Sequence, residues 1–340
     1  MNEIRLTAKD FTTDQEVRWC PGCGDYAILK AIRAALADIG RAPDDVVFVS
    51  GIGCAARLPY YISSYGFHTI HGRAPAIATG IKLANPDLDV WVAGGDGDFL
   101  SIGGNHLLHA LRRNVDLNLL LFNNAVYGLT KGQYSPTSYT GTRTPSTPDG
   151  SVDTPVNAAL FALGAGARFV ARSGDTLMDH LPGVLKQAHA HAGASFVEIL
   201  QNCIVYNDAV FDHVTDKKTG ADHAIRVEHG KPMIYGREGD RGLVIEPGTG
   251  TVNSVVLGDG LKEEDLSVHD ETNFAQAAAL AAMDGGHLPM ALGVLYNAPA
   301  PDYTSLRSAG FDQGSFGRDE LDALLKGGAT WTVEPASNDA

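Results

Sequence analysis

The 340-residue sequence is poor in basic residues and in cysteine, and it has no long hydrophobic run. It holds 26 lysine and arginine residues against 40 aspartate and glutamate residues, so its formal net charge is −14. An acidic surface repels a phosphate backbone, which argues against nucleic-acid binding. No apolar stretch approaches the ~18 residues of a membrane span, and the opening MNEIRLTAKDFTTDQEVRW lacks the apolar core of a secretory signal. We therefore expect a cytoplasmic protein that binds neither nucleic acid nor membrane.

Only four cysteines occur, at Cys20, Cys23, Cys54 and Cys203. Disulfides are rare in the cytoplasm, but four thiolates can close a zinc site or hold an iron–sulfur cluster. Zinc ribbons usually combine two CxxC pairs, and this chain has only one, in RWCPGCGDY. The spacing alone favours a [4Fe–4S] cluster, and it leaves open a zinc site or a redox-active dithiol of Cys20 and Cys23.

Apolar and helix-like runs alternate along the first two thirds of the chain. Hydrophobic residues make up 44% of the sequence, which allows a substantial core. Residues 26–38 (YAILKAIRAALAD) have the spacing of an amphipathic helix, and the β-branched run VVFVS follows. The runs VWVA, LNLLLF and SFVEIL continue this alternation. The pattern predicts an α/β fold with a doubly wound, mainly parallel sheet.

The last third of the chain has a different character. Beyond about residue 205 the periodicity weakens, and residues 206–340 hold 10 basic against 22 acidic residues. We expect a main α/β domain over 1–205 and an irregular C-terminal extension over 206–340. Residues 133–155, rich in Gly, Ser, Thr and Pro, predict a long loop that is either functional or disordered.

Unusual residues follow the predicted strands, where an open parallel sheet binds its ligands. The run VWVA leads into Gly-Gly-Asp96-Gly-Asp98, and LNLLLF leads into Asn123-Asn124. Carboxylate and amide oxygens suit Mg²⁺, which usually completes its shell with substrate phosphates. The glycines let a phosphate approach the backbone. GDG and NN, separated by 25 residues at two strand ends, form the thiamine diphosphate signature.

The other two predicted strands end near cysteines. VVFVS leads into Gly51-Ile-Gly-Cys54, and SFVEIL leads into Gln201-Asn-Cys203. Thiamine chemistry on a 2-oxo acid releases electrons that need an acceptor. A [4Fe–4S] cluster beside the thiamine site would take them, which strengthens that interpretation of the cysteines.

These motifs resemble the β subunits of 2-oxoacid:ferredoxin oxidoreductases. The resemblance covers about residues 15–210 closely and the rest loosely, through WCPGCGDYAILKAI, GIGCAARLPYYISSYGFHTIHGRAPAIATG, VWVAGGDGDFLSIGGNHLLHALRRN and LLLFNNAVYGLTKGQYSPTS. The segment GLTKGQYSPTS is most similar to the 2-oxoglutarate (2-oxoglutarate synthase) branch. The family fold implied is a thiamine diphosphate-binding domain, here over residues 1–205.

The resemblance also implies roles for individual residues. The [4Fe–4S] cluster would be held by Cys20, Cys23, Cys54 and Cys203. Magnesium would be held by Asp96, Asn124 and the backbone carbonyl of Val126. Thiamine diphosphate would be lined by Ile52, Gly53, Cys54, Ala55, His71, Gly97, Asp98, Gly128 and Leu129. Arg57 would meet the 2-oxo acid carboxylate, although the family often has lysine there, and Lys131 would meet the distal end of the substrate.

The implied reaction is the oxidative decarboxylation of a 2-oxo acid, with coenzyme A, to acyl-CoA and CO₂. Ferredoxin would be the electron acceptor, and the same groups would run the reverse carboxylation. We find no glutamate suited to activate the thiamine ring, and the family keeps it on an α subunit. The chain is therefore expected to act only with that subunit, in an αβ or (αβ)₂ assembly. Acidic ferredoxin would dock near the basic residues Arg18, Lys30 and Arg33.

Three alternatives stay open at this point. The enzyme could be a member specific for pyruvate or branched-chain 2-oxo acids. It could be a non-oxidative thiamine-dependent lyase or synthase subunit whose cysteines bind zinc or nothing. It could also be an electron-transfer or scaffold subunit with a vestigial thiamine site, which the complete GDG and NN set argues against.

Overall fold

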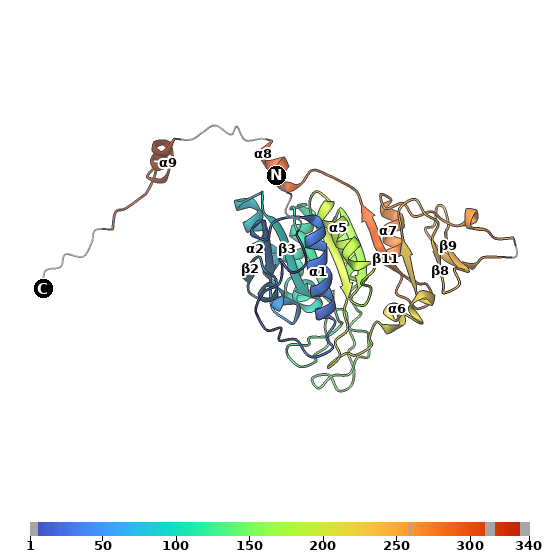
Figure 1. Ribbon diagram of the computed structural model, residues 1–340. Helices are drawn as coiled ribbons and strands as arrows, with labels where there is room; N and C mark the ends of the chain where they lie inside the picture. Colours follow the sequence, from blue (N-terminus) through green and yellow to red (C-terminus); the bar gives the residue numbers. More distant parts are fainter. Residues whose placement is uncertain (1–5, 259, 310–316, 334–340) are drawn as a thin grey trace. The chain divides into compact units, whose positions relative to one another are not determined.

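The computed structural model describes residues 6–258, 260–309 and 317–333 (Figure 1). Its main sheet has eight strands in the order β2-β1-β3-β4-β6-β5-β11-β7, and β11 runs antiparallel to β5 while the other neighbours are parallel. The strands are β1 (Val46–Ser50), β2 (Tyr65–His68), β3 (Asp89–Gly95), β4 (Asn118–Asn123), β5 (Phe169–Gly174), β6 (Ser195–Leu200), β7 (Ala224–Val227) and β11 (Met290–Asn297). The predicted mainly parallel sheet is confirmed.

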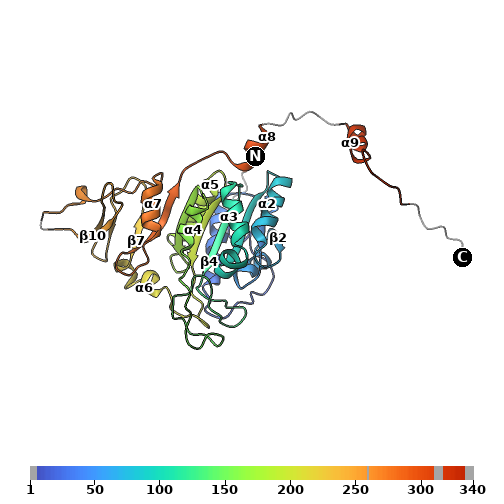
Figure 2. The ribbon, with the colours of Figure 1, turned by 180° about the vertical axis from the view of Figure 1, so that it is seen from behind.

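Helices cover both faces of this sheet. One face carries α1 (Asp25–Ile39) and α5 (Leu181–Ala190), which lie in front in Figure 1. The other face, turned forward in Figure 2, carries α2 (Ala74–Ala84), α3 (Gly104–Arg112), α4 (Ala158–Gly164) and α7 (Phe274–Ala281). In β1, alternate residues enter the two cores, Val46 and Phe48 on the α1 side and Val47 and Val49 on the α2 side. Burial on both faces explains why the strand runs are continuously apolar rather than alternating.

Helix α1 illustrates how local chemistry sets an element. Its buried positions recur at helical spacing through Ile28, Ile32 and Leu36. It ends where Gly40 takes a left-handed φ of 79° and donates its N–H to the Leu36 carbonyl. A side chain there would be strained, so glycine stops the helix and turns the chain toward β1.

Residues 206–304 belong to the same compact unit as the rest of the main sheet. Strands β7 and β11 extend the main sheet, and a small antiparallel sheet contains β8 (Ile234–Tyr235), β9 (Arg241–Ile245) and β10 (Val252–Val256), beside the short helix α6 (Asp212–Thr215). Residues 1–304 form one compact unit, and residues 305–340 form a second that contains α9 (Arg318–Leu325), with α8 (Tyr303–Ser308) at the boundary. The division at residue 205 stays a prediction.

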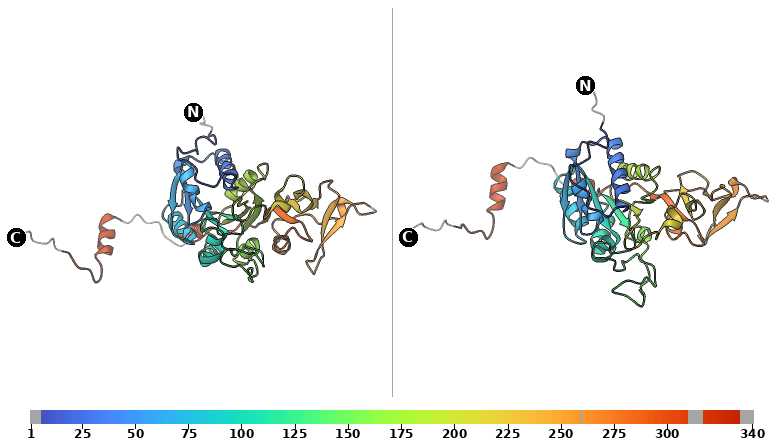
Figure 3. Two further views of the ribbon diagram at one scale, coloured as in Figure 1. Left: turned by 90° about the horizontal axis from the view of Figure 1, so that it is seen from below. Right: turned by 60° about the horizontal axis from the view of Figure 1, so that its bottom comes forward.

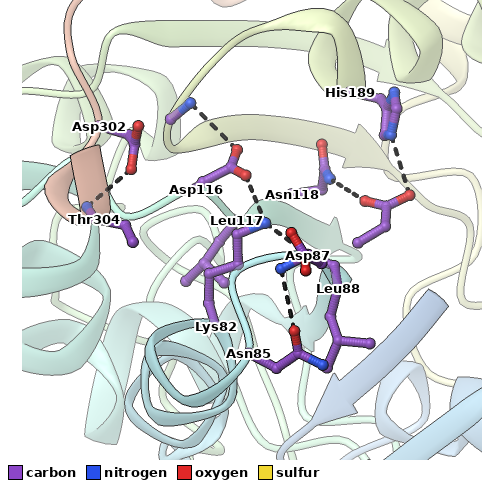
Figure 4. Close-up of polar contacts among 12 residues, drawn as sticks. Lys82, Asn85, Asp87, Leu88, Asp116, Leu117, Asn118, His189, Asp302 and Thr304 are labelled. Atoms are coloured by element: carbon purple, nitrogen blue, oxygen red, sulfur yellow. Dashed lines mark hydrogen bonds and ion pairs between the residues drawn. The ribbon is translucent and has the colours of Figure 1, made fainter. Parts of the chain in front are cut away.

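A polar network closes the amino-terminal edge of the strands (Figure 4). Lys82, at the end of α2, donates to the Leu88 carbonyl at 2.8 Å and pairs with Asp116 at 2.7 Å. Asp89, which opens β3, accepts from Asn118 and pairs with His189 of α5. These contacts tie helices to strand starts on the edge opposite to the loops described below.

Candidate functional site

The carboxyl ends of four adjacent parallel strands lie at one edge of the sheet. Strands β1, β3, β4 and β6 are neighbours in that order, so the segments after Ser50, Gly95, Asn123 and Leu200 meet there. Figure 3, left, views the molecule from this side. The sequence predicted this convergence on the condition that the strands were parallel and adjacent, and the structure confirms the condition.

A cavity of about 180 Å³ lies at this edge. All residues expected to line thiamine diphosphate face it: Ile52, Gly53, Cys54, Ala55, His71, Gly97, Asp98, Gly128 and Leu129. The three expected magnesium ligands, Asp96, Asn124 and Val126, line it as well. Their individual roles stay predictions, but the structure gathers them in one place from the ends of four strands, β1, β2, β3 and β4.

Asp98 joins the loops around this cavity. Its Oδ1 accepts from the Ile52 and Gly72 backbone N–H groups at 3.1 and 2.7 Å and lies 2.6 Å from His71 Nδ1. A methyl group on Gly51 would lie 2.2 Å from Asp98 Oδ2, so the loop after β1 can approach only as glycine. Asp98 therefore holds the cavity wall together and fixes the His71 ring.

Asp96 has the environment of a cation ligand. It is 2% exposed, and burial raises the pKa of its carboxyl group to about 6 although the hydroxyls of Ser135 and Thr137 oppose the shift. Asn124 Oδ1 accepts only a 3.3 Å bond from Val126 N–H within the described chain, which leaves the amide oxygen free to bind further. In the described ranges Asp96 makes no ion pair with a basic side chain, and a buried carboxylate that lines one cavity with a free amide oxygen fits magnesium.

Sequence reasoning missed several polar residues behind this cavity. Thr137 Oγ1 lies 2.7 Å from Asp96 Oδ2 and 2.8 Å from Asn123 Oδ1. Thr137 belongs to the 133–155 loop, whose Ser135, Thr137 and Ser138 are all at least nine-tenths buried. The composition of the loop gave no signal for which of its hydroxyls would be buried.

The four cysteines line a second cavity, of about 210 Å³. A methyl group on Gly128 would lie 3.6 Å from Cys54 Sγ and 3.5 Å from Cys203 Sγ, so these two thiols flank one glycine. Gln201 Nε2 donates to Cys23 Sγ at 3.2 Å, and Trp19 Nε1 donates to the Cys54 carbonyl at 2.8 Å. Thiols that lie up to 183 positions apart in the sequence therefore meet in one cavity.

Electrostatics in this cavity oppose free thiolates. Burial, followed by the charges of Asp25 and neighbouring thiols, raises the pKa of Cys54 to about 12, and burial and Asp25 raise that of Cys23 further. Ionising several thiols here requires a positively charged group among them. An iron–sulfur cluster or a metal ion would supply that charge, and the cluster stays a prediction. Among the residues that the structure describes, no group of three or more His, Cys, Asp or Glu side chains is arranged to hold a metal ion.

Asp25, which directly follows the CPGCG motif, is another site residue that the sequence motifs did not predict. It is 1% exposed, lines the thiamine cavity, and interacts with Cys23. Burial raises the pKa of its carboxyl group to about 7, and its Oδ2 has no hydrogen-bond partner in the described part of the chain. Its position directly after the predicted cysteine-ligand motif is a sequence feature that could have indicated a role for Asp25.

Arg57 and Lys131 both line the cysteine cavity, together with Arg18. Lys131 adopts a left-handed φ of 76°, an uncommon backbone conformation for a non-glycine residue. Two of the proposed ferredoxin contacts are already engaged, because Arg18 pairs with Glu16 at 2.8 Å and Arg33 donates to the Tyr61 carbonyl. Burial lowers the pKa of Arg33, which argues against it as a docking residue.

None of the helices in the described ranges is both long enough and apolar enough to cross a membrane.

Comparison with known proteins identifies the family. Residues 51–199 match the model of the thiamine pyrophosphate enzyme, C-terminal TPP binding domain. The 2-oxoglutarate oxidoreductase subunit KorB of Mycobacterium tuberculosis is 49% identical over 96% of this chain and 88% of its own length. The 2-oxoacid:ferredoxin oxidoreductase 1 subunit beta of Aeropyrum pernix is 50% identical over 56% of this chain and 60% of its own length.

A solved structure gives the same answer. A 2-oxoglutarate:ferredoxin oxidoreductase from Magnetococcus marinus, with 2-oxoglutarate, coenzyme A and succinyl-CoA bound, superposes with a TM-score of 0.75 at 32% identity. The match covers 95% of this chain and 97% of that one. The chain therefore belongs to the β-subunit family of the 2-oxoacid:ferredoxin oxidoreductases, in the branch of the 2-oxoglutarate oxidoreductases.

Proposed function

We propose that this chain is the β subunit of an enzyme that converts 2-oxoglutarate and coenzyme A to succinyl-CoA, CO₂, a proton and two electrons for ferredoxin. One observation carries the proposal. The thiamine cavity and the cysteine cavity adjoin, and Cys54, Asn124, Gly128 and Leu129 line both. Two cofactors bound there would be neighbours, as electron transfer from one to the other requires.

The thiamine cavity supports binding of a diphosphate with magnesium. Thiamine diphosphate, when bound, supplies the nucleophilic carbon that adds to a 2-oxo group and permits loss of CO₂. Asp96, Asn124 and the Val126 carbonyl would hold magnesium. Gly97 lets the Tyr127 ring pack against the backbone in the cavity wall, because a methyl group there would lie 2.0 Å from the ring. Asp98 would keep the Ile52 and Gly72 loops closed around the cofactor.

The cysteine cavity supports a [4Fe–4S] cluster, which when bound accepts electrons one at a time. Its volume of about 210 Å³ exceeds what a single ion needs, and four thiols from three segments line it. Trp19 and Gln201 donate hydrogen bonds beside the thiols, and such donors tune the potential of a cluster. The cations Arg57 and Lys131 line the same cavity and would meet the two carboxylates of 2-oxoglutarate.

An α subunit would complete the site. Apolar side chains are exposed on the edge strand β2 and the neighbouring loops, with Tyr65 61%, Phe67 47% and Ile70 70% exposed. Ile102, 49% exposed, lies against Gly72 at the rim of the thiamine cavity. Exposed apolar groups of this extent mark protein interfaces. We assign the α subunit, and the glutamate that activates thiamine, to this surface; the αβ or (αβ)₂ assembly and the cytoplasmic location stay predictions.

Electron paramagnetic resonance of the oxygen-free complex tests this function. The chain is co-expressed with the α subunit of its operon, and spectra are recorded before and after 2-oxoglutarate with coenzyme A. We expect a reduced-cluster signal that grows with 2-oxoglutarate and not with pyruvate. An iron-free protein that binds zinc or nothing would favour the non-oxidative lyase. A signal that only pyruvate or a branched-chain 2-oxo acid produces would keep the family and overturn the substrate.

A further inference from the structure

A continuous line of buried polar contacts crosses the sheet and ends at Asp96. Arg172 Nε of β5 donates to Glu198 Oε2 of β6 at 2.7 Å, and Asn123 Nδ2 of β4 donates to Glu198 Oε1 at 2.8 Å. Asn123 Oδ1 lies 2.8 Å from Thr137 Oγ1, which lies 2.7 Å from Asp96 Oδ2. All five residues are buried. The line therefore joins four neighbouring strands beneath the thiamine cavity.

The chemistry of the groups fixes the direction of each bond. The Glu198 carboxylate can only accept, so Asn123 must turn its NH₂ toward it and its oxygen toward Thr137. The Ala125 N–H donates to the same Asn123 oxygen at 3.2 Å. The single Thr137 proton then goes to Asp96, because an ionised carboxylate is the stronger acceptor and Asn123 Oδ1 already has a donor.

The segment that carries Thr137 is itself anchored. Ser138 Oγ donates to the Ala125 carbonyl at 2.6 Å and accepts from the Ser135 N–H at 2.8 Å. Ala125 holds a left-handed φ of 52°, and Asn207 Nδ2 donates to its carbonyl at 3.1 Å. The loop after β4 and the start of the 133–155 loop are thus locked together, which gives Thr137 a fixed position.

We propose that Thr137 is a positioning residue that holds the Asp96 carboxylate in the orientation magnesium requires. The anchored start of the 133–155 loop, where Ser138 donates to the Ala125 carbonyl and accepts from the Ser135 N–H, holds Thr137 in turn. The inference rests on the proposed magnesium site and adds to it a residue that touches neither metal nor cofactor. Magnesium demands near-ideal octahedral geometry, so a carboxylate free to rotate binds it less well. Losing the outer partner of a metal ligand typically lowers metal affinity about 10- to 100-fold.

Magnesium titration of the αβ complex tests this inference. Bound thiamine diphosphate is measured by equilibrium dialysis at rising Mg²⁺ concentration, which requires no turnover. We expect Thr137→Val to need about 10- to 100-fold more Mg²⁺ than wild type. Thr137→Ser, which keeps the hydroxyl, is expected to match wild type. Thr79→Val is the control, because Thr79 donates to the Pro75 carbonyl within α2, away from the site.

The outcomes separate this inference from the proposed function. Wild-type Mg²⁺ dependence in Thr137→Val would overturn the positioning role. A serine variant as weak as the valine variant would overturn it too, since the hydroxyl would then not be sufficient to position Asp96. If the valine variant does not fold, Thr137→Ala removes the same hydroxyl without an added methyl, and the same loss is expected. Failure of the wild type to bind thiamine diphosphate with Mg²⁺ would overturn the proposed function instead.

Discussion

Glu198→Gln removes one charge from the buried pair at the centre of the sheet. Each Glu198 oxygen accepts from a different donor, Oε1 from Asn123 and Oε2 from Arg172. A glutamine side chain has only one oxygen, so in either orientation its NH₂ would face a donor. With the NH₂ toward Arg172, that side chain, 3% exposed, would keep only long bonds of 3.4 and 3.5 Å to backbone carbonyls. In both orientations the guanidinium would lose the charge of its partner.

The expected loss of stability follows from this geometry. Breaking a buried ion pair by removing one partner costs about 3–5 kcal/mol, because an uncompensated charge stays buried. For the compact unit of residues 1–304, an unfolding entropy of about 2.1 cal/mol/K per residue converts this loss to a fall of about 5–8 °C in Tm. Asp38→Asn is the matched control. Asp38 of α1 pairs with Lys186 of α5, and the two side chains are 59% and 42% exposed, so the pair contributes about 1 kcal/mol or less.

Scanning calorimetry of the complex, without added Mg²⁺ or thiamine diphosphate, measures both variants against wild type. We expect the Tm of Glu198→Gln to fall several times further than that of Asp38→Asn. Equal shifts in the two variants, or an unchanged Tm in Glu198→Gln, would refute the reasoning that the charge of this buried pair, rather than its packing, stabilises the fold.

Three further predictions concern single positions. Gly97→Ala places a methyl group 2.0 Å from the Tyr127 ring, and the resulting overpacking is expected to weaken thiamine diphosphate binding about tenfold by calorimetric titration. Gly104→Ala, with nothing within 4 Å, should bind normally, and equal affinities would contradict the cavity assignment. Cys203→Ser is expected to lose the cluster iron and visible absorbance while the protein stays folded, and unchanged iron content would exclude Cys203 as a ligand. Burial lowers the pKa of His180 from 6.5 to about 4. Between these pH values His180 is protonated in the unfolded chain but not in the folded chain, so the free energy of unfolding falls as pH falls. Urea unfolding measures this loss of unfolding free energy between pH 6.5 and pH 4. In His180→Gln we expect the loss to be smaller by about 2 kcal/mol, a value that allows for solvent screening. An equal loss in the variant and wild type would show that other groups cause it.

The sequence predicted some elements and not others for physical reasons. Strands β3, β4 and β6 were predictable because burial on both faces leaves continuous apolar runs. Strand β2 was missed because it is a short edge strand whose residues are all exposed. Strand β11 was missed because it lies in an acidic region of weak periodicity, although its first seven residues are buried. Pairing with β5 and β7, rather than local pattern, stabilises it.

The sequence by itself determined the chemical inventory: one CxxC pair with two further cysteines, the GDG and NN strand ends, and the alternation that implies a doubly wound sheet. Only the tertiary structure decided which of these meet. Cys203 reaches the CxxC pair because the segment after β6 meets the segment before α1, where the Gly24 N–H donates to the Asn202 carbonyl. Thr137 reaches Asp96 because its loop folds back beneath the strand ends. Strand order and loop burial depend on contacts between residues far apart in the chain. Local propensity cannot encode such contacts, because each gains its stabilisation only when the whole sheet has formed.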